Sequence, residues 1–313
     1  MKNGKRYPLL FLKGMAMGAA DVVPGVSGGT IAFITGIYEE LLGSIAKIDI
    51  EALKLLSKFQ IKAFWERING TFLLVLVSGI LLSIFSLARL ITFLLEAHPI
   101  PIWSFFFGLI LISCFLVIKE IKEWSWKVVL GFLVGTAVAF YITIASPTQT
   151  SNELWFVFIS GAIAICAMIL PGISGSFILL LLGKYAYIFS AIKEMNIAVI
   201  IVFGIGCITG ILTFSRGVSW LLKNYYNTVI GILAGFMIGS LNKIWPWKIT
   251  TSYRMNSEGV QVPFMEKNIT PTQFVEITGN DPQVLYAILL ALVGIVLVIV
   301  IEKIGSRYAS NGH

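Results

Sequence analysis

The sequence predicts an all-α polytopic membrane protein with two inverted repeats, each a broken re-entrant hairpin followed by three transmembrane helices. Hydrophobic residues make up 57% of the 313-residue chain and charged residues only 12%, well below the roughly 25% charged residues of soluble domains. Apolar runs of about 20 residues, the length that spans a bilayer, recur from end to end. A proline-glycine break also occurs twice inside apolar sequence, and the residues that follow each break match without a gap.

The two breaks are Pro24-Gly25 and Pro171-Gly172. Proline lacks the backbone donor that a helix needs, and glycine allows turns that other residues resist. Within hydrocarbon, such irregular backbone is tolerated only where protein or a water-filled cavity surrounds it. A single break would suggest a kink between packed helices. Two breaks in corresponding positions favour a transporter's binding site.

The first repeat, residues 1–147, begins with a hairpin at 8–46 whose arms, 8–23 and 26–46, meet at Pro24-Gly25. A basic stretch at 47–70 follows, with apolar residues at helical spacing, and it predicts a helix that lies along the membrane surface. Three apolar spans complete the repeat, at 72–95, 100–118 and 127–146.

The second repeat, residues 148–313, begins with a hairpin at 154–192 whose arms, about 154–169 and 173–192, flank Pro171-Gly172. Its three spans are expected at 197–222, 227–245 and 284–302. A polar insertion at 246–283 separates the last two and contains strand-like stretches such as Val260-Gln261-Val262.

Charge predicts the orientation of the chain. Most positive residues lie at the N-terminus, at 47–70, at Lys119–Lys127, at Lys223 and at Lys303–Arg307. Since positive loops favour the cytoplasm, both termini are expected there and the 246–283 insertion outside. Lys248, Arg254 and Lys267 of that insertion depart from the rule, but long loops carry little weight in it.

The two repeats also match beyond the breaks, because residues 79–113 align with 206–240 without a gap and Arg89 falls on Arg216. Three spans after each hairpin is an odd number, so the second repeat must be inverted, as in many transporters. An arginine in the middle of a span is costly and tends to mark function. The alternative is that each arginine snorkels to the interface.

The residues after each break favour an anion site. A new helix begins there, and its free N–H groups and positive dipole end attract negative charge. Glycine lets a ligand approach the backbone closely, and the hydroxyl groups can donate hydrogen bonds to it. The planar guanidinium of an arginine can bind a phosphate through two parallel hydrogen bonds. A phosphomonoester, with a charge of about −1.5 to −2, fits two such sites best. The alternative is that the serine and glycine residues after each break only cap the helix that begins there. The candidate binding residues are Ser27, Gly28, Gly29, Thr30, Arg89, Ser174, Gly175, Ser176 and Arg216.

Asp21 lies three residues before the first break, and the matching position in the second repeat is Met168. A lone carboxylate inside the membrane suggests a proton or sodium coupling site, or the partner of an arginine. The sequence does not decide between these two interpretations.

Other classes of site receive no support. Three cysteines lie in apolar spans and only two histidines are present, so neither a disulfide framework nor a metal centre is expected. The net charge of +7 is accounted for by cytoplasmic loops and does not require nucleic acid. No cofactor is predicted, and the oligomeric state stays open.

Residues 18–32, continuing to Gly36-Ile37-Tyr38-Glu39, resemble the bacterial polyprenyl-phosphate transporter family. The resemblance implies a protein of the bacterial cytoplasmic (inner) membrane that returns undecaprenyl phosphate, the lipid carrier of cell-wall precursors, to the inner leaflet. The second motif departs from the first by Ser176 in place of Gly29 and Phe177 in place of Thr30. Equal roles for the two breaks are therefore in doubt.

Two alternatives to a lipid transporter stand beside this prediction. Integral-membrane prenyl-diphosphate phosphatases also use a Pro-Gly-x-Ser turn, but with an arginine after the serine, where this chain has Gly28 or Gly175. No cluster of glutamates is available for acid–base catalysis, so the sequence predicts that the chain is not an enzyme. An anion channel or small-solute carrier is the third interpretation.

Overall fold

The computed structural model describes residues 6–23, 25–148, 150–255 and 261–310. Within this part of the chain, five helices are long and apolar enough to cross a membrane. They are α6 (Gly70–Ala97), α7 (Pro99–Lys119), α8 (Trp126–Ile144), α12 (Ile197–Ser240) and α14 (Val284–Ser310). The prediction of a polytopic, mainly helical membrane protein is confirmed.

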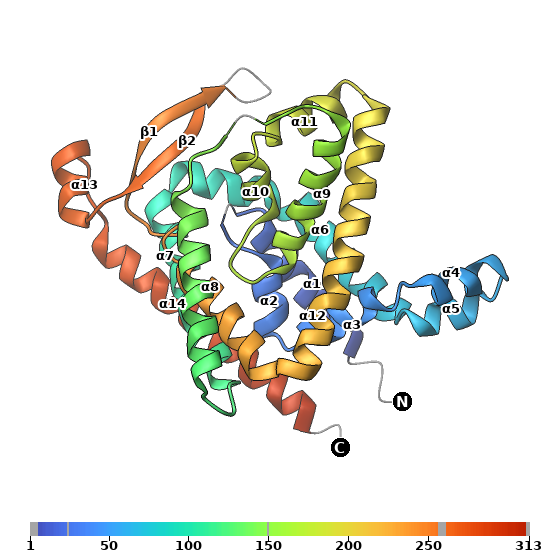
Figure 1. Ribbon diagram of the computed structural model, residues 1–313. Helices are drawn as coiled ribbons and strands as arrows, with labels where there is room; N and C mark the ends of the chain where they lie inside the picture. The colour runs from blue at the N-terminus through green and yellow to red at the C-terminus, as the bar shows by residue number, and fades with distance from the viewer. Residues whose placement is uncertain (1–5, 24, 149, 256–260, 311–313) are drawn as a thin grey trace.

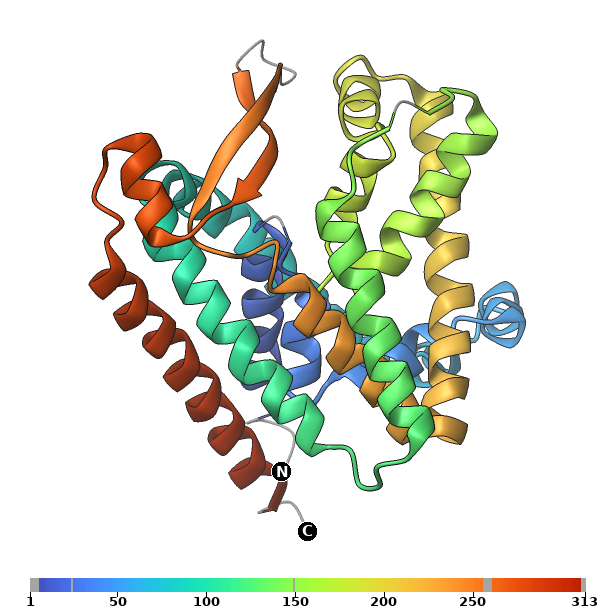
Figure 2. The same cartoon turned by 60° about the vertical axis from the view of Figure 1, so that its left-hand side comes forward.

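The spans expected at 197–222 and 227–245 are not separated by a loop. Both belong to α12, which has 44 residues and would be about 66 Å long if straight, twice the roughly 30 Å hydrocarbon core. Tyr225 has a non-helical backbone, with φ −137° and ψ 44°. The chain turns back there, and the second half of α12 runs from the turn toward the centre of the molecule (Figures 1 and 2).

Each broken hairpin contains three helices, where the sequence predicted two arms. Hairpin one consists of α1 (Arg6–Asp21), α2 (Gly28–Ile34) and α3 (Tyr38–Ala46). Hairpin two consists of α9 (Leu154–Ile169), α10 (Gly175–Leu181) and α11 (Tyr185–Lys193).

Glycines in matching positions divide the outgoing arms. Gly36 has φ +71° and Gly183 has φ +65°, and a glycine in this left-handed region ends a helix. The Ile37 N–H donates to the Ala32 carbonyl, closing α2 in the manner of a Schellman motif. α11 consequently turns by 104° from α10. The prediction of continuous arms at 26–46 and 173–192 was wrong.

The predicted surface helix at 47–70 is likewise two helices, α4 (Ile50–Ser57) and α5 (Ile61–Arg67). The chain turns between them at Phe59, which has φ +55° and is 88% exposed. Exposed Leu53 and Trp65 lie on the same pair of helices. This apolar, exposed unit projects from the helix bundle (Figure 1), as an element at a membrane surface would.

The polar insertion forms two antiparallel strands, β1 (Lys248–Met255) and β2 (Gln261–Asn268), followed by α13 (Pro271–Thr278). Of the strand-like stretch predicted from the sequence, Gln261 and Val262 lie in β2, while Val260 lies outside the described residues. Figures 1 and 2 show that β1 and β2 lie at one end of the molecule, where α9 also begins, whereas α1 begins and α14 ends at the other. We call these ends the β1–β2 side and the termini side.

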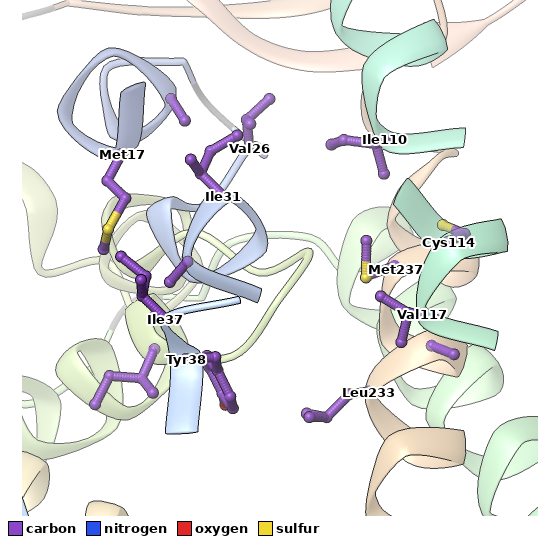
Figure 3. Close-up of a cluster of buried hydrophobic side chains, with 14 of the residues drawn as sticks. Met17, Val26, Ile31, Ile37, Tyr38, Ile110, Cys114, Val117, Leu233 and Met237 are labelled. Atoms are coloured by element: carbon purple, nitrogen blue, oxygen red, sulfur yellow. The ribbon is translucent and has the colours of Figure 1, made fainter. Parts of the chain in front are cut away.

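The long helices pack in corresponding pairs. α1 packs along α6, α9 along the first half of α12, α8 against α12, and α14 against α7. The buried core joins hairpin one to α7 and α12. Figure 3 shows side chains of hairpin one on one side of this core and those of α7 and α12 on the other, with labels on Met17, Val26, Ile31, Ile37, Tyr38, Ile110, Cys114, Val117, Leu233 and Met237. Hairpin one is therefore held in the interior of the bundle.

Candidate functional site

The two helix breaks meet in the interior of the molecule. The Ser27 hydroxyl donates to the Met168 carbonyl at 2.9 Å, and the Gly172 N–H donates to the Thr30 hydroxyl oxygen at 3.0 Å. Ser27 and Thr30 are completely buried. Residues about 140 positions apart in the chain thus form one hydrogen-bonded crossing, which we call the crossing of the two breaks.

The glycines of the two breaks have the same φ angle. Gly25 and Gly172 each have φ +87°, a conformation that strains any residue with a Cβ. Gly25 packs against the side chain of Lys243, and Gly172 packs against Ser240 near the end of α12. Pro24, the first residue of the first break, lies outside the described residues.

The first three backbone donors of α2 are already occupied. Asp21 accepts the Gly28 N–H at 2.7 Å, the Ser27 hydroxyl accepts the Gly29 N–H at 3.0 Å, and the Thr30 N–H donates to the Ser27 carbonyl. The expectation of free N–H groups here was wrong, because a carboxylate is favoured at a helix N-terminus and the chain supplies its own. This contact also shows that Asp21 supports the backbone of the first break.

The second break differs from the first in its donors. Met168 replaces the carboxylate, and the hydroxyls of Ser174 and Ser176 lie 2.8 Å apart. Within the described chain, the N–H groups of Gly175 and Ser176 have no hydrogen-bond acceptor. Ser174 and Gly175 are buried, whereas Ser176 is exposed. The sequence departure at Ser176 therefore accompanies a real difference between the two breaks.

The first arginine lies near the level of the first break. Gly14 and Gly18 of α1 lie against the backbone of Leu76 and Ile80 of α6, so the two helices run in parallel. Both helices rise by 1.5 Å per residue, so counting along them from these contacts places Arg89 close to the level at which α1 ends. Its side chain is exposed and makes no hydrogen bond or ion pair with any residue that the structure describes.

The second arginine follows the same pattern along its helix. Gly206 and Gly210 of α12 lie against the backbone of Phe158 and Ala162 of α9, and counting on from them places Arg216 near the level of the second break. The glycines allow this close approach of two helices, as in many membrane proteins.

Arg216 is nevertheless directed to hairpin one. Its Nε donates to the Ala46 carbonyl at 3.3 Å and its Nη2 to the Ile48 carbonyl at 2.7 Å. Ala46 is the last residue of α3 and Ile48 lies two residues beyond it, where a cation is favoured by the helix dipole. In this structure neither arginine is bonded to a break.

Sequence reasoning missed a basic cavity on the β1–β2 side. A space of about 210 Å³ lies between the ends of α8 and α12, α10, and the two strands. We call this space the lysine pocket, and its polar lining consists of Thr143, Asn242, Lys243, Lys248, Glu266, Lys267 and Asn268. Two of these residues, Lys248 and Lys267, had been noted only as departures from the positive-inside rule. That departure was the signal in the sequence.

Glu266 joins two of the pocket's lysines. Its carboxylate lies 3.2 Å from the Lys243 ammonium and 3.7 Å from that of Lys248. The Lys248 side chain is 7% exposed, donates to the Lys243 carbonyl at 2.7 Å and lies 3.7 Å from the centre of the Trp103 ring.

Burial and charge act in opposite directions on these groups. Burial lowers the pKa of Lys248 to about 7, although Glu266 raises it. Burial raises the pKa of Glu266, but the neighbouring Lys248 and Lys243 outweigh burial and hold that pKa below its ordinary value. The pocket therefore contains an ionised carboxylate and a lysine whose charge depends on what lies beside it.

Within the described residues, no group of three histidine, cysteine, aspartate or glutamate side chains is placed to hold a metal ion. Cys114, Cys166 and Cys207 are free thiols on the helices. The chemistry available at the crossing and in the lysine pocket is accordingly hydrogen bonding and charge.

Comparisons with known proteins agree with this chemistry. A family model described as undecaprenyl phosphate translocase-like matches residues 17–262. A polyprenyl-phosphate transporter of Vibrio cholerae is 48% identical over 301 residues, which cover 96% of this chain and 98% of the relative. A polyprenyl-phosphate transporter of Staphylococcus aureus is 35% identical over 253 residues, which cover 75% of this chain and 85% of the relative. No solved structure matches the chain.

Proposed function

The chain belongs to the undecaprenyl phosphate translocase-like family, and from this premise we propose that it carries a polyprenyl phosphate lipid across the bacterial cytoplasmic membrane. The observation that carries the proposal is the hydrogen-bonded crossing of the two breaks. Irregular backbone in this position is characteristic of sites where a transporter holds its cargo. The lipid carrier would return in this way to the inner leaflet for another round of cell-envelope synthesis.

The two repeats are proposed to be inverted relative to each other. Hairpin one begins on the termini side and hairpin two on the β1–β2 side (Figures 1 and 2). The equal φ of Gly25 and Gly172 and the matching divisions at Gly36 and Gly183 support this symmetry. Rocking of one repeat against the other would then expose the crossing to each side in turn.

The arginines are proposed to have alternating roles. Arg216 holds the carbonyls at and just beyond the end of α3, and so ties hairpin one to α12 on the termini side. Arg89, exposed and without such bonds, is available to the phosphate. Inversion of the repeats would exchange these two roles when the protein opens to the other side.

Lipid transport is tested with the purified protein in proteoliposomes that contain a fluorescent short-chain polyprenyl phosphate. Accelerated loss of fluorescence to a membrane-impermeant quencher is expected for the phosphate and not for the matching polyprenol. Liposomes without protein are the control. Equal rates with and without protein would refute transport, and phosphate release from a prenyl diphosphate would instead indicate a phosphatase.

Orientation is tested separately with single cysteines in a chain whose own cysteines are replaced. Ser151→Cys and Thr278→Cys should react from outside with an impermeant reagent, and Ser57→Cys should not, because positive charge favours the cytoplasm for the termini side. All three positions are exposed, so accessibility to solvent is matched. The reverse labelling pattern would contradict the orientation.

A further inference from the structure

We propose that the lysine pocket binds the phosphomonoester head of the lipid on the β1–β2 side of the protein. This inference rests on the proposed function and adds a binding site to it. The pocket is a separate cavity of about 210 Å³, and neither the arginines nor the serines of the breaks line it.

The charges of the pocket match such a head group. The Lys243 and Lys248 ammonium groups lie beside the Glu266 carboxylate, and exposed Lys267 is a third basic residue of the lining, so basic residues outnumber acidic ones there. A phosphomonoester carries a charge of about −1.5 to −2 at neutral pH. Asn242 and Asn268 also line the pocket, but the Asn268 amide donates to Asn242 and the Asn242 amide donates to Thr143, so the lysines are the main donors for a ligand.

Lys248 is the buried lysine of the pocket, and an added anion would stabilise its charge. Its side chain is 7% exposed and its ammonium has the Lys243 carbonyl at 2.7 Å and the Glu266 carboxylate at the longer distance of 3.7 Å. A buried ammonium is costly unless it is paired. A second anion beside it would offset that cost and keep the lysine protonated.

The pocket adjoins both helix breaks. The side chain of Lys243 packs on Gly25 at the first break, and its ammonium lies 4.8 Å from the centre of the Phe177 ring in α10, directly after the second break. A head group bound to Lys243 therefore lies next to the two elements whose movement would carry it inward. This position suits an entry site.

The remaining lining favours a lipid over free phosphate. Ile144, Phe177 and Leu181 form apolar walls of the same cavity. Ile144 is 56% exposed at the end of α8, a helix long and apolar enough to face lipid. A prenyl chain could leave the pocket past Ile144 and stay in hydrocarbon while its phosphate contacts the lysines.

Three variants test the pocket by isothermal titration calorimetry of farnesyl phosphate into the detergent-solubilised protein. Lys243→Gln and Lys248→Met should each weaken binding about tenfold or more, because each removes a charged hydrogen-bond donor. Glu266→Gln should tighten binding several-fold, because it removes the carboxylate that competes with the ligand. Lys193→Gln, an exposed lysine on the same side but outside the pocket, is the matched control and should bind like the parent.

The sign of the Glu266→Gln effect distinguishes a ligand site from a structural ion cluster. A structural role predicts weaker or unchanged binding for all three variants, and that result would overturn the proposal. If Lys248→Met fails to fold, Lys243→Gln and Glu266→Gln still decide, because the proposal predicts that they change the affinity in opposite directions. Farnesol should not bind measurably, and inorganic phosphate that competes as strongly as farnesyl phosphate would overturn the assignment to a lipid.

The outcome is separable from that of the proposed function. A parent protein that moves polyprenyl phosphate in proteoliposomes but does not bind farnesyl phosphate in the pocket would refute this site alone. A parent that binds farnesyl phosphate with the expected variant pattern but moves no lipid would refute transport and leave the site standing.

Discussion

Replacing Thr30 by valine removes one hydroxyl from the crossing of the two breaks and leaves the side-chain shape nearly unchanged. The Gly172 N–H, which now donates to that hydroxyl at 3.0 Å, would lose its acceptor. Thr30 is completely buried, so water cannot replace the lost partner. A buried donor left unpaired costs about 1–3 kcal/mol, and we expect Thr30→Val to lower the free energy of unfolding by that amount.

The assay is reversible unfolding in mixed detergent micelles, followed by helical circular dichroism. Thr35→Val is the matched control, because it deletes the same group from the same hairpin. The Thr35 hydroxyl donates to the Ile31 carbonyl at 2.7 Å, but the Thr35 N–H also donates to it, so no group is left unpaired and a change below about 0.5 kcal/mol is expected. If both variants unfold like the parent, the crossing does not hold the hairpins together.

Three further changes test the site. Arg216→Lys should slow lipid flipping about tenfold in proteoliposomes, because one ammonium cannot replace a guanidinium that donates to two carbonyls. A variant that flips lipid at the parental rate would show that these two hydrogen bonds are dispensable. Asp21→Asn keeps an acceptor for the Gly28 N–H, so this variant should fold and bind lipid phosphate. It should lose the pH or sodium dependence of flipping. If its flipping depends on pH and sodium as in the parent, Asp21 is excluded as the coupling site. Farnesyl phosphate affinity should fall as pH rises from 7 to 9, because Lys248, with its pKa lowered to about 7, loses its proton while the phosphate is already fully charged. Lys248→Met should flatten that dependence, and an equally steep fall in this variant would assign the titration to another group.

Local chemistry explains most of what the sequence predicted correctly. Pro24-Gly25 and Pro171-Gly172 break helices wherever they occur, and both glycines have the positive φ that the motif implies. The length of the apolar runs predicted the spanning helices for the same reason, since any helix that crosses a bilayer requires about 20 apolar residues. Gly36 and Gly183 carry an equally local signal, because a glycine with positive φ ends a helix.

The depth of each arginine followed from counting residues, but its partner did not. Arg216 meets Ala46 and Ile48, about 170 positions away in the chain, and no periodicity in the sequence encodes that contact. Asp21 likewise occupies the N-terminus of α2 because the chain doubles back at the break, which the spacing allowed but did not require.

The sequence by itself determined that the chain is a polytopic membrane protein, that its hairpins turn at two proline-glycine pairs, and which family it resembles, because these depend on composition and on neighbours in the chain. Only the tertiary structure decided that the two breaks bond to each other, that the first break is filled by Asp21, and that Lys243, Lys248 and Glu266 form one pocket. These features arise where hairpins, helix ends and strands from distant parts of the chain come within a few ångströms. Such meetings are determined by packing of the whole bundle, and a single sequence does not display them.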